Sequence, residues 1–195
     1  MDLQRELDEF NELLEDLSEN PPVQKPKPKP NTTHCPPAVY PTMSQDNRVH
    51  QVIDGLYIGS QDAAVNHEEL ILHSITHILN VACFVPNHFP HEFTYMCVEG
   101  IYDQVDFNIT PYLEPCVEFI HGGLEGGGCV LVHCNAGVSR SASMIVAYLM
   151  KWKGLSLEEA LEVVREGRRM ARPNNGFLRN LRDYGVSVSG ENEGT

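Results

Sequence analysis

The chain has 195 residues, of which 42% are hydrophobic and 21% charged, as is typical of one packed domain with an extension. Its formal net charge of −13 argues against a nucleic-acid binder, because such proteins neutralise phosphates with positive charge. The longest apolar run, Met144–Met150, is too short to span a membrane. The acidic N-terminus and six scattered cysteines do not indicate secretion, so we expect a cytoplasmic protein, with the nucleus as a further location.

The first 48 residues divide into two segments of opposite charge. Residues 1–20 carry a net charge of −7 and place leucines at helical spacing, which predicts an acidic amphipathic helix. So short a helix cannot bury its apolar stripe alone, which leaves docking on a protein partner, self-association or disorder as alternatives. Residues 21–48 carry a net charge of +3 and alternate proline with lysine, which predicts an extended linker.

The hydrophobic pattern of a folded domain covers residues 49–187, and we expect a flexible tail over 188–195. Runs of apolar and β-branched residues separated by turn residues predict the first elements of this domain. These elements are two short strands around a turn at Asp54-Gly55, a short helix around Glu68–His73, and strands over 77–82 and 93–99.

The second half of the domain alternates strand and helix signals. Thr110 and Pro111 form a typical helix start, and Gly122-Gly123 predicts the end of that helix. Cys129–His133 is an apolar run typical of a central buried strand. Three further helices are expected over 141–152, from a capping box at Ser156 and Glu159, and from Asn174 or Asn175 to Asp183. The alternation predicts an α/β fold, a single domain whose central, mostly parallel sheet is flanked by helices.

The most informative segment is HCNAGVSRS, residues 133–141, between the central strand and the next helix. Successive backbone N–H groups at such a junction can bind an anion, assisted by the positive end of the helix. Arg140 offers a planar set of donors to phosphate oxygens. Cys134 should then have a depressed pKa and act as the nucleophile in phosphoryl transfer. Ser141 can donate a hydrogen bond to the sulfur and help it leave in the second step.

The other loop residues have supporting roles in this interpretation. His133 is expected to orient the loop through hydrogen bonds, and glycine at 137 allows a backbone conformation that a side chain would block. The residues expected to present backbone N–H groups to phosphate are Asn135, Ala136, Gly137, Val138 and Ser139. The alternative is an inert buried cysteine, but this pattern arises by chance only about 10⁻⁵ to 10⁻⁴ times in such a chain.

The segment HCNAGVSRSAS resembles the signature loop of cysteine-dependent protein phosphatases. VIDGLYIGSQDAA, THILNVA and PNNGF resemble segments of the dual-specificity subfamily, so the resemblance extends over about 49–187. It implies a protein tyrosine phosphatase-like fold, hydrolysis of phospho-Tyr and phospho-Ser/Thr through a cysteinyl-phosphate, and a role in regulating kinase signalling. It also implies no cofactor, and the nine histidines show no metal-ligand spacing with paired cysteines.

The resemblance suggests the substrate class as well. Relatives that prefer phosphoinositides often carry lysines in this loop, and their absence here favours phosphoproteins, with kinases of a MAP kinase pathway as candidate partners. The alternative is a catalytically weak scaffold that binds kinases or phosphoproteins. Cys83 is interpreted either as a packed core thiol or as a redox partner of the nucleophile, as found in some relatives.

Phosphoester cleavage also needs an acid to protonate the leaving oxygen. Glu99, Asp103 and Asp106 are the candidates, and the family's spacing favours Asp103, which is 31 residues before Cys134, over Asp106. Asp103 would first protonate the leaving oxygen and then activate the water that hydrolyses the intermediate. The resemblance makes Asn174 a structural support of the active-site wall.

Overall fold

The structure, a computed structural model, describes residues 46–192. The acidic helix expected over 1–20, the linker up to residue 45 and the last three residues of the tail lie outside the described residues. In chain order the elements are β1 (His50–Ile53), β2 (Leu56–Gly59), α2 (Gln61–Ala64), α3 (His67–Leu72), β3 (Ile75–Asn80), β4 (Thr94–Cys97), α4 (Thr110–Glu125), β5 (Cys129–His133), α5 (Arg140–Lys153), α6 (Leu157–Gly167) and α7 (Asn175–Asn192).

The five strands form one sheet in the order β1-β2-β5-β3-β4. β5 is central and parallel to both β2 and β3, β4 is parallel to β3, and only β1 and β2 pair antiparallel. Burial of β5 on both faces explains its continuous apolar sequence. The predicted α/β fold with a central, mostly parallel sheet is therefore confirmed.

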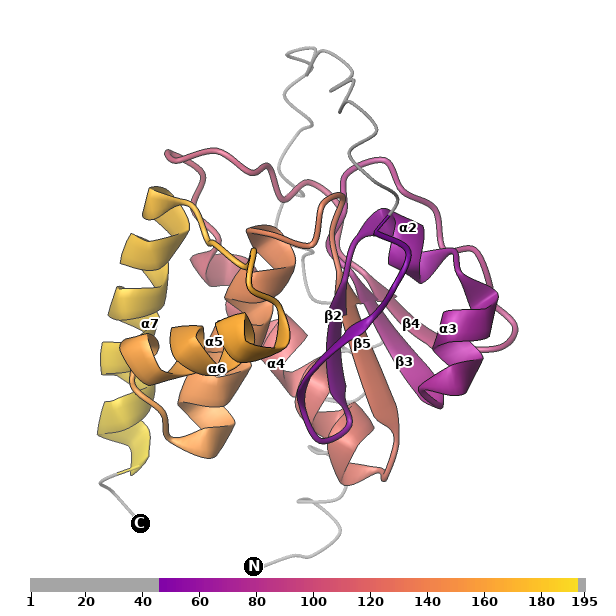
Figure 1. Cartoon of the computed structure of the whole chain (residues 1–195). Helices are drawn as coiled ribbons and strands as arrows, with labels where there is room; N and C mark the ends of the chain where they lie inside the picture. Colours follow the sequence, from indigo (N-terminus) through magenta and orange to yellow (C-terminus); the bar gives the residue numbers. More distant parts are fainter. Residues whose placement is uncertain (1–45, 193–195) are drawn as a thin grey trace, which may run out of the picture. The chain divides into compact units, whose positions relative to one another are not determined.

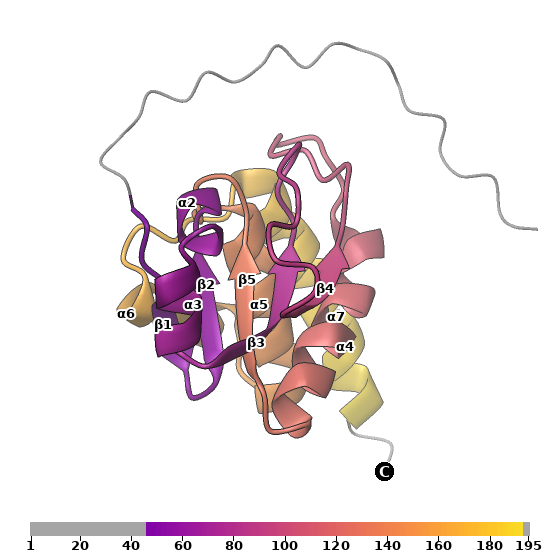
Figure 2. The same ribbon diagram turned by 90° about the vertical axis from the view of Figure 1, so that its right-hand side faces the viewer.

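Helices cover both faces of this sheet, with α4 to α7 on one side and α2 and α3 on the other (Figure 1, Figure 2). Side chains alternate along β5, so that Val130 and Val132 pack in the larger core with α4 to α7, whereas Leu131 packs in the smaller core with α2 and α3. α5 is buried along most of its length and contacts α4, α6 and α7. It therefore holds the segment that precedes it against the carboxyl end of β5.

Two helices extend further than expected. The prediction that α4 ends at Gly122-Gly123 is wrong, because the helix continues to Glu125. A Cβ at Gly123 would lie 2.7 Å from Val130 Cγ2, so this glycine permits close packing of helix on sheet rather than ending the helix. α7 continues past Asp183 to Asn192, into the tail expected to be flexible, because the apolar residues Tyr184 and Val188 remain buried in the core.

The helix N-termini differ from the expectation in one case. Ile109, not Thr110, is the N-cap of α4, and it makes no side-chain capping bond. The capping box of Ser156 and Glu159 is present at the start of α6. Asn174 rather than Asn175 precedes α7, and its side-chain oxygen accepts the Gly176 and Phe177 N–H groups. Within residues 46–192 no helix is both long and apolar enough to cross a membrane.

Candidate active site

The loop between β5 and α5 surrounds the thiol of Cys134, which is 1% exposed. The Gly137 N–H donates to Cys134 Sγ over 3.2 Å, and the Ser141 hydroxyl lies 3.3 Å from the same sulfur. Gly137 has φ +65°, and a Cβ there would lie 2.5 Å from the Gly59 carbonyl oxygen. Only glycine fits this position, which brings the loop close to the end of β2.

These contacts alter the acidity of the thiol. Burial alone would raise the pKa of Cys134, since it disfavours the charged form. The positive charge of Arg140 and hydrogen bonds from the Ser141 side chain and from the Ser141 and Val138 backbone outweigh that effect and hold the pKa below its ordinary value. The site therefore favours a thiolate, which is the nucleophilic form of cysteine.

Arg140 is 4% exposed and only partly paired with the protein. Its Nη1 donates to Cys83 Sγ over 3.1 Å and to the Ile101 carbonyl over 3.4 Å. Its Nε has no hydrogen-bond partner within residues 46–192. A buried guanidinium with an unpaired donor is costly unless an anion binds to it, so Arg140 and the loop together provide a site for a phosphoryl group.

A second buried arginine holds the loop. The Arg168 side chain is 2% exposed and donates from Nε to the Gly137 carbonyl over 2.6 Å and from Nη2 to the Ala136 carbonyl over 3.0 Å. Its Nη2 also lies 2.7 Å from Asp46 Oδ2. Sequence reasoning missed this role, because a basic residue just after a helix carries no signal of its distant partners.

The Arg172 N–H donates to the Val138 carbonyl over 2.7 Å. Together with the bonds from Arg168 to Ala136 and Gly137, the carbonyls of three successive loop residues therefore accept hydrogen bonds from outside the loop. Turning these carbonyls outward leaves the loop's N–H groups on the other side, where an anion can accept from them. This arrangement supports the roles expected for residues 135–139, although their contacts with phosphate stay a prediction.

Asp103 lies at the rim of the loop. Its Oδ1 accepts from the Ser139 hydroxyl over 2.7 Å and from Asn174 Nδ2 over 2.8 Å. Asn174 also donates its backbone N–H to Ser139 and caps α7, so it joins Asp103, the loop and the last helix. Within residues 46–192 neither Asp106 nor Glu99 makes such a bond to the loop. The structure therefore brings Asp103, rather than the alternatives, to the loop.

His133 and Asn135 lie on either side of the nucleophile in the sequence. Burial lowers the pKa of His133 to about 4, although a hydrogen bond to the Cys134 backbone acts in the opposite direction. His133 is therefore a neutral ring inside the fold at pH 7. The Asn135 side chain accepts from the Cys83 N–H and donates to the Cys83 carbonyl and to Gln61 Oε1. Asn135 thereby joins the loop to α2 and to the segment after β3.

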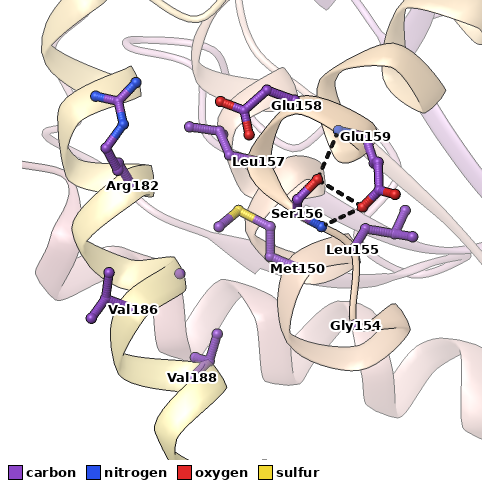
Figure 3. Close-up of a pocket in the computed structure, with 11 residues that line it drawn as sticks. Met150, Gly154, Leu155, Ser156, Leu157, Glu158, Glu159, Arg182, Val186 and Val188 are labelled. Carbon is purple, nitrogen blue, oxygen red and sulfur yellow. Dashed lines mark hydrogen bonds between the residues drawn. The ribbon is translucent and has the colours of Figure 1, made fainter.

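A hollow of about 750 Å³ lies elsewhere, between α7 and the corner from α5 to α6 (Figure 3). Met150, Leu157 and Val186 line it, and the polar bonds drawn there belong to the capping box of Ser156 and Glu159. It contains no cysteine, and none of its residues belongs to the loop. Among residues 46–192, no cluster of three His, Cys, Asp or Glu side chains is arranged to hold a metal ion.

Comparison with known proteins assigns the family. Residues 56–187 match the dual specificity phosphatase catalytic domain. Dual specificity protein phosphatase 1 of Arabidopsis thaliana is 43% identical over 147 residues, which cover 75% of this chain and 74% of that protein. Dual specificity protein phosphatase 19 of Mus musculus is 44% identical over 144 residues, which cover 74% of this chain and 65% of that protein. The chain therefore belongs to the dual specificity phosphatase family, as its loop indicated.

One further relative and one solved structure show how much of each protein the similarity covers. Protein phosphatase Slingshot homolog 3 of Mus musculus is 44% identical over 142 residues, but these cover only 22% of that protein and 73% of this chain. The crystal structure of human DUSP28 superposes with a TM-score of 0.69 at 31% identity, covering 72% of this chain and 95% of that one. The enzyme class expected from the sequence, a cysteine-dependent dual-specificity phosphatase, is confirmed.

Proposed function

We propose that this protein hydrolyses phospho-Tyr and phospho-Ser/Thr in signalling proteins. The observation that carries the proposal is the geometry around Cys134, whose sulfur accepts from the loop beside a buried Arg140 with an unpaired donor. That combination supplies a nucleophile and a site for the phosphoryl oxygens in one place. The exposed carboxylate of Asp103 at the rim supplies the acid that the reaction needs.

The first chemical step forms a sulfur–phosphorus bond and breaks the bond from phosphorus to the substrate oxygen. Arg140 and the loop N–H groups stabilise the charge on the equatorial oxygens, while Asp103 gives its proton to the leaving oxygen. In the second step Asp103 accepts a proton from water, which attacks phosphorus as the bond to sulfur breaks. Ser141, 3.3 Å from the sulfur, stabilises the thiolate that leaves.

The physiological targets belong to this proposal too. The loop from 134 to 140 contains no lysine, which favours phosphoproteins over phosphoinositides. Kinases of a MAP kinase pathway are the partners we propose, with the cytoplasm and the nucleus as locations. An Asp103→Ala protein that binds phosphoproteins without turning them over can be used to capture them from cells, and recovery of no kinase would argue against this choice of partner.

The decisive experiment measures hydrolysis of p-nitrophenyl phosphate by the full chain and by a Cys134→Ser variant. We expect the substitution to reduce kcat on the order of 10⁴-fold, because the sulfur forms the intermediate. The variant's Tm should change little, since serine fills nearly the same volume. Equal background rates in the two proteins would contradict the enzyme and favour the alternative, a scaffold that binds phosphoproteins without hydrolysing them.

A further inference from the structure

Phe84, which follows β3, combines an unfavourable backbone with an exposed ring. Its φ is +59°, and its side chain is 87% exposed. A bulky residue in the left-handed region is a rare and strained conformation, and such strain often marks a functional site. Core packing does not explain the residue, because the ring is in solvent and makes no ring contact within residues 46–192.

The backbone that carries Phe84 is fixed to the active-site loop. The preceding residue, Cys83, exchanges two hydrogen bonds with the Asn135 side chain, both 3.1 Å long. Its sulfur accepts from Arg140 over 3.1 Å. Phe84 is therefore one residue away from contacts to the nucleophile's neighbour and to the phosphate-binding arginine, so its backbone is fixed beside the active-site loop.

Asn135 also bonds the first residue of α2, which borders a small hollow. Gln61, the first residue of α2, donates its backbone N–H to the Asn135 carbonyl over 3.2 Å and accepts from the Asn135 side chain over 3.0 Å. Between α2 and the segment that begins with Phe84 lies a hollow of about 260 Å³, which also borders Asp62. This volume is below the roughly 300–1,000 Å³ of small-molecule pockets and suits one or two peptide side chains.

The chemistry of the hollow favours a cation with a flat face. Phe84 offers an exposed aromatic ring, and Asp62 offers an exposed carboxylate that makes no side-chain ion pair within residues 46–192. The imidazole of His88 lines the same hollow, and as a neutral ring it adds a second flat face for stacking. A guanidinium can stack on the ring and donate to the carboxylate at the same time. Residues 49–195 carry a net charge of −9, which also attracts a basic ligand.

We propose that Phe84 and Asp62 form a subsite that binds an arginine side chain of the substrate, close in sequence to the phosphorylated residue. The proposal rests on the phosphoprotein phosphatase function above and adds a preference for basic phosphopeptides. The phosphoryl group lies in the loop, and the arginine lies across Asn135 in the hollow, so one peptide spans both.

The test uses a set of phosphotyrosine peptides that share one background sequence. At each position flanking the phosphorylated residue in turn, one peptide carries arginine and its matched partner carries glutamine. The full chain is compared with Phe84→Gly, which suits the left-handed backbone, and with Asp62→Asn. Ser74→Gly is the matched control, because Ser74 is also exposed with a positive φ, +52°, but lies between α3 and β3. Hydrolysis of p-nitrophenyl phosphate, which has no flanking residue to occupy the hollow, is measured for all four proteins.

We expect arginine at one position to raise kcat/KM about five-fold over glutamine in the full chain and in the Ser74→Gly control. Phe84→Gly and Asp62→Asn should each remove most of that preference, while p-nitrophenyl phosphate turnover changes by less than about two-fold. A preference that survives in either variant, a preference for an apolar residue instead, or no preference at all would overturn the subsite. Failure of the full chain to hydrolyse p-nitrophenyl phosphate would overturn the proposed function itself.

Discussion

Two buried arginines contact the surroundings of Cys134, and their partners differ. Arg168 donates to two loop carbonyls and pairs with Asp46, although its Nη1, like one nitrogen of Arg140, has no partner within residues 46–192. Arg140 donates to Cys83 and Ile101 from one nitrogen, and its Nε is left without a partner within residues 46–192. The first arginine holds the loop in shape, and the second is available for substrate.

The comparison shows why burial and charge alone do not identify a catalytic residue. Both side chains are arginines, both are at most 4% exposed, and both lie beside the same loop. The difference is that Arg140 affects the nucleophile, since its charge lowers the pKa of Cys134, whereas Arg168 is not among the causes of that shift. An effect on the acidity of the nucleophile is thus a sharper mark of function than burial or an unpaired donor, which the two arginines share.

Of substitutions at the two arginines, the larger effect is expected for Arg140→Lys, which keeps the charge but removes the planar pair of donors. We expect kcat/KM for p-nitrophenyl phosphate to fall about 10³-fold, because the lost bonds are made to the transition state. The affinity for vanadate should fall in parallel, while Tm changes little. A variant with near-normal kcat/KM would show that a charge suffices and would remove the distinction between the two arginines.

Asp103→Asn is expected to lower kcat about 100-fold at neutral pH, since an amide cannot donate the proton to the leaving oxygen. The effect should be larger for phosphoserine than for aryl phosphates, whose leaving groups need less assistance. Asp106→Asn is the matched control and should retain full activity, because its side chain makes no hydrogen bond to the loop within residues 46–192. The reverse pattern would make Asp106 the acid.

Arg168→Lys should reduce kcat/KM only about ten-fold, because lysine cannot bond two carbonyls and Asp46 together and the loop loses its shape. Its main effect is on stability, with a loss of about 2–4 kcal/mol in the free energy of unfolding, measured by urea denaturation. If activity fell as far as in Arg140→Lys while stability was unchanged, Arg168 would belong to the catalytic residues instead.

The smallest effect concerns the acidity of the Cys134 thiol. It is measured as the rate of alkylation by iodoacetamide at a series of pH values. The pKa of Cys134 is held below its ordinary value, so the rate should reach half of its maximum at a lower pH than for a free thiol. Ser141→Ala should move this midpoint upward, because it removes a hydrogen bond that stabilises the thiolate. Arg168→Lys should move it less, because Arg168 bonds loop carbonyls and not the sulfur itself. An upward shift in Arg168→Lys comparable to that in Ser141→Ala would contradict the separation of roles.

Much of the site could be expected from the order of the residues alone. The strand at Cys129–His133, the loop after it and the helix that follows are contiguous in sequence, so one local pattern carries the nucleophile, Arg140 and Ser141. Asn174 and Asp103 required the resemblance to a family, because they are 40 and 31 residues from Cys134. The ends of α4 and α7 were wrong because they depend on packing at Gly123 and Val188, which local turn signals do not report.

The sequence by itself determined the fold class and the chemical centre, because both depend on periodicity and on residues that are neighbours along the chain. Only the tertiary structure decided which distant groups complete that centre. Arg168 and Asp46 are 122 residues apart, and Cys83 and Gln61 are bonded to the loop through Asn135. Such partners are selected by the geometry of the packed chain, since a hydrogen bond requires closeness in space and leaves no regular spacing in the sequence.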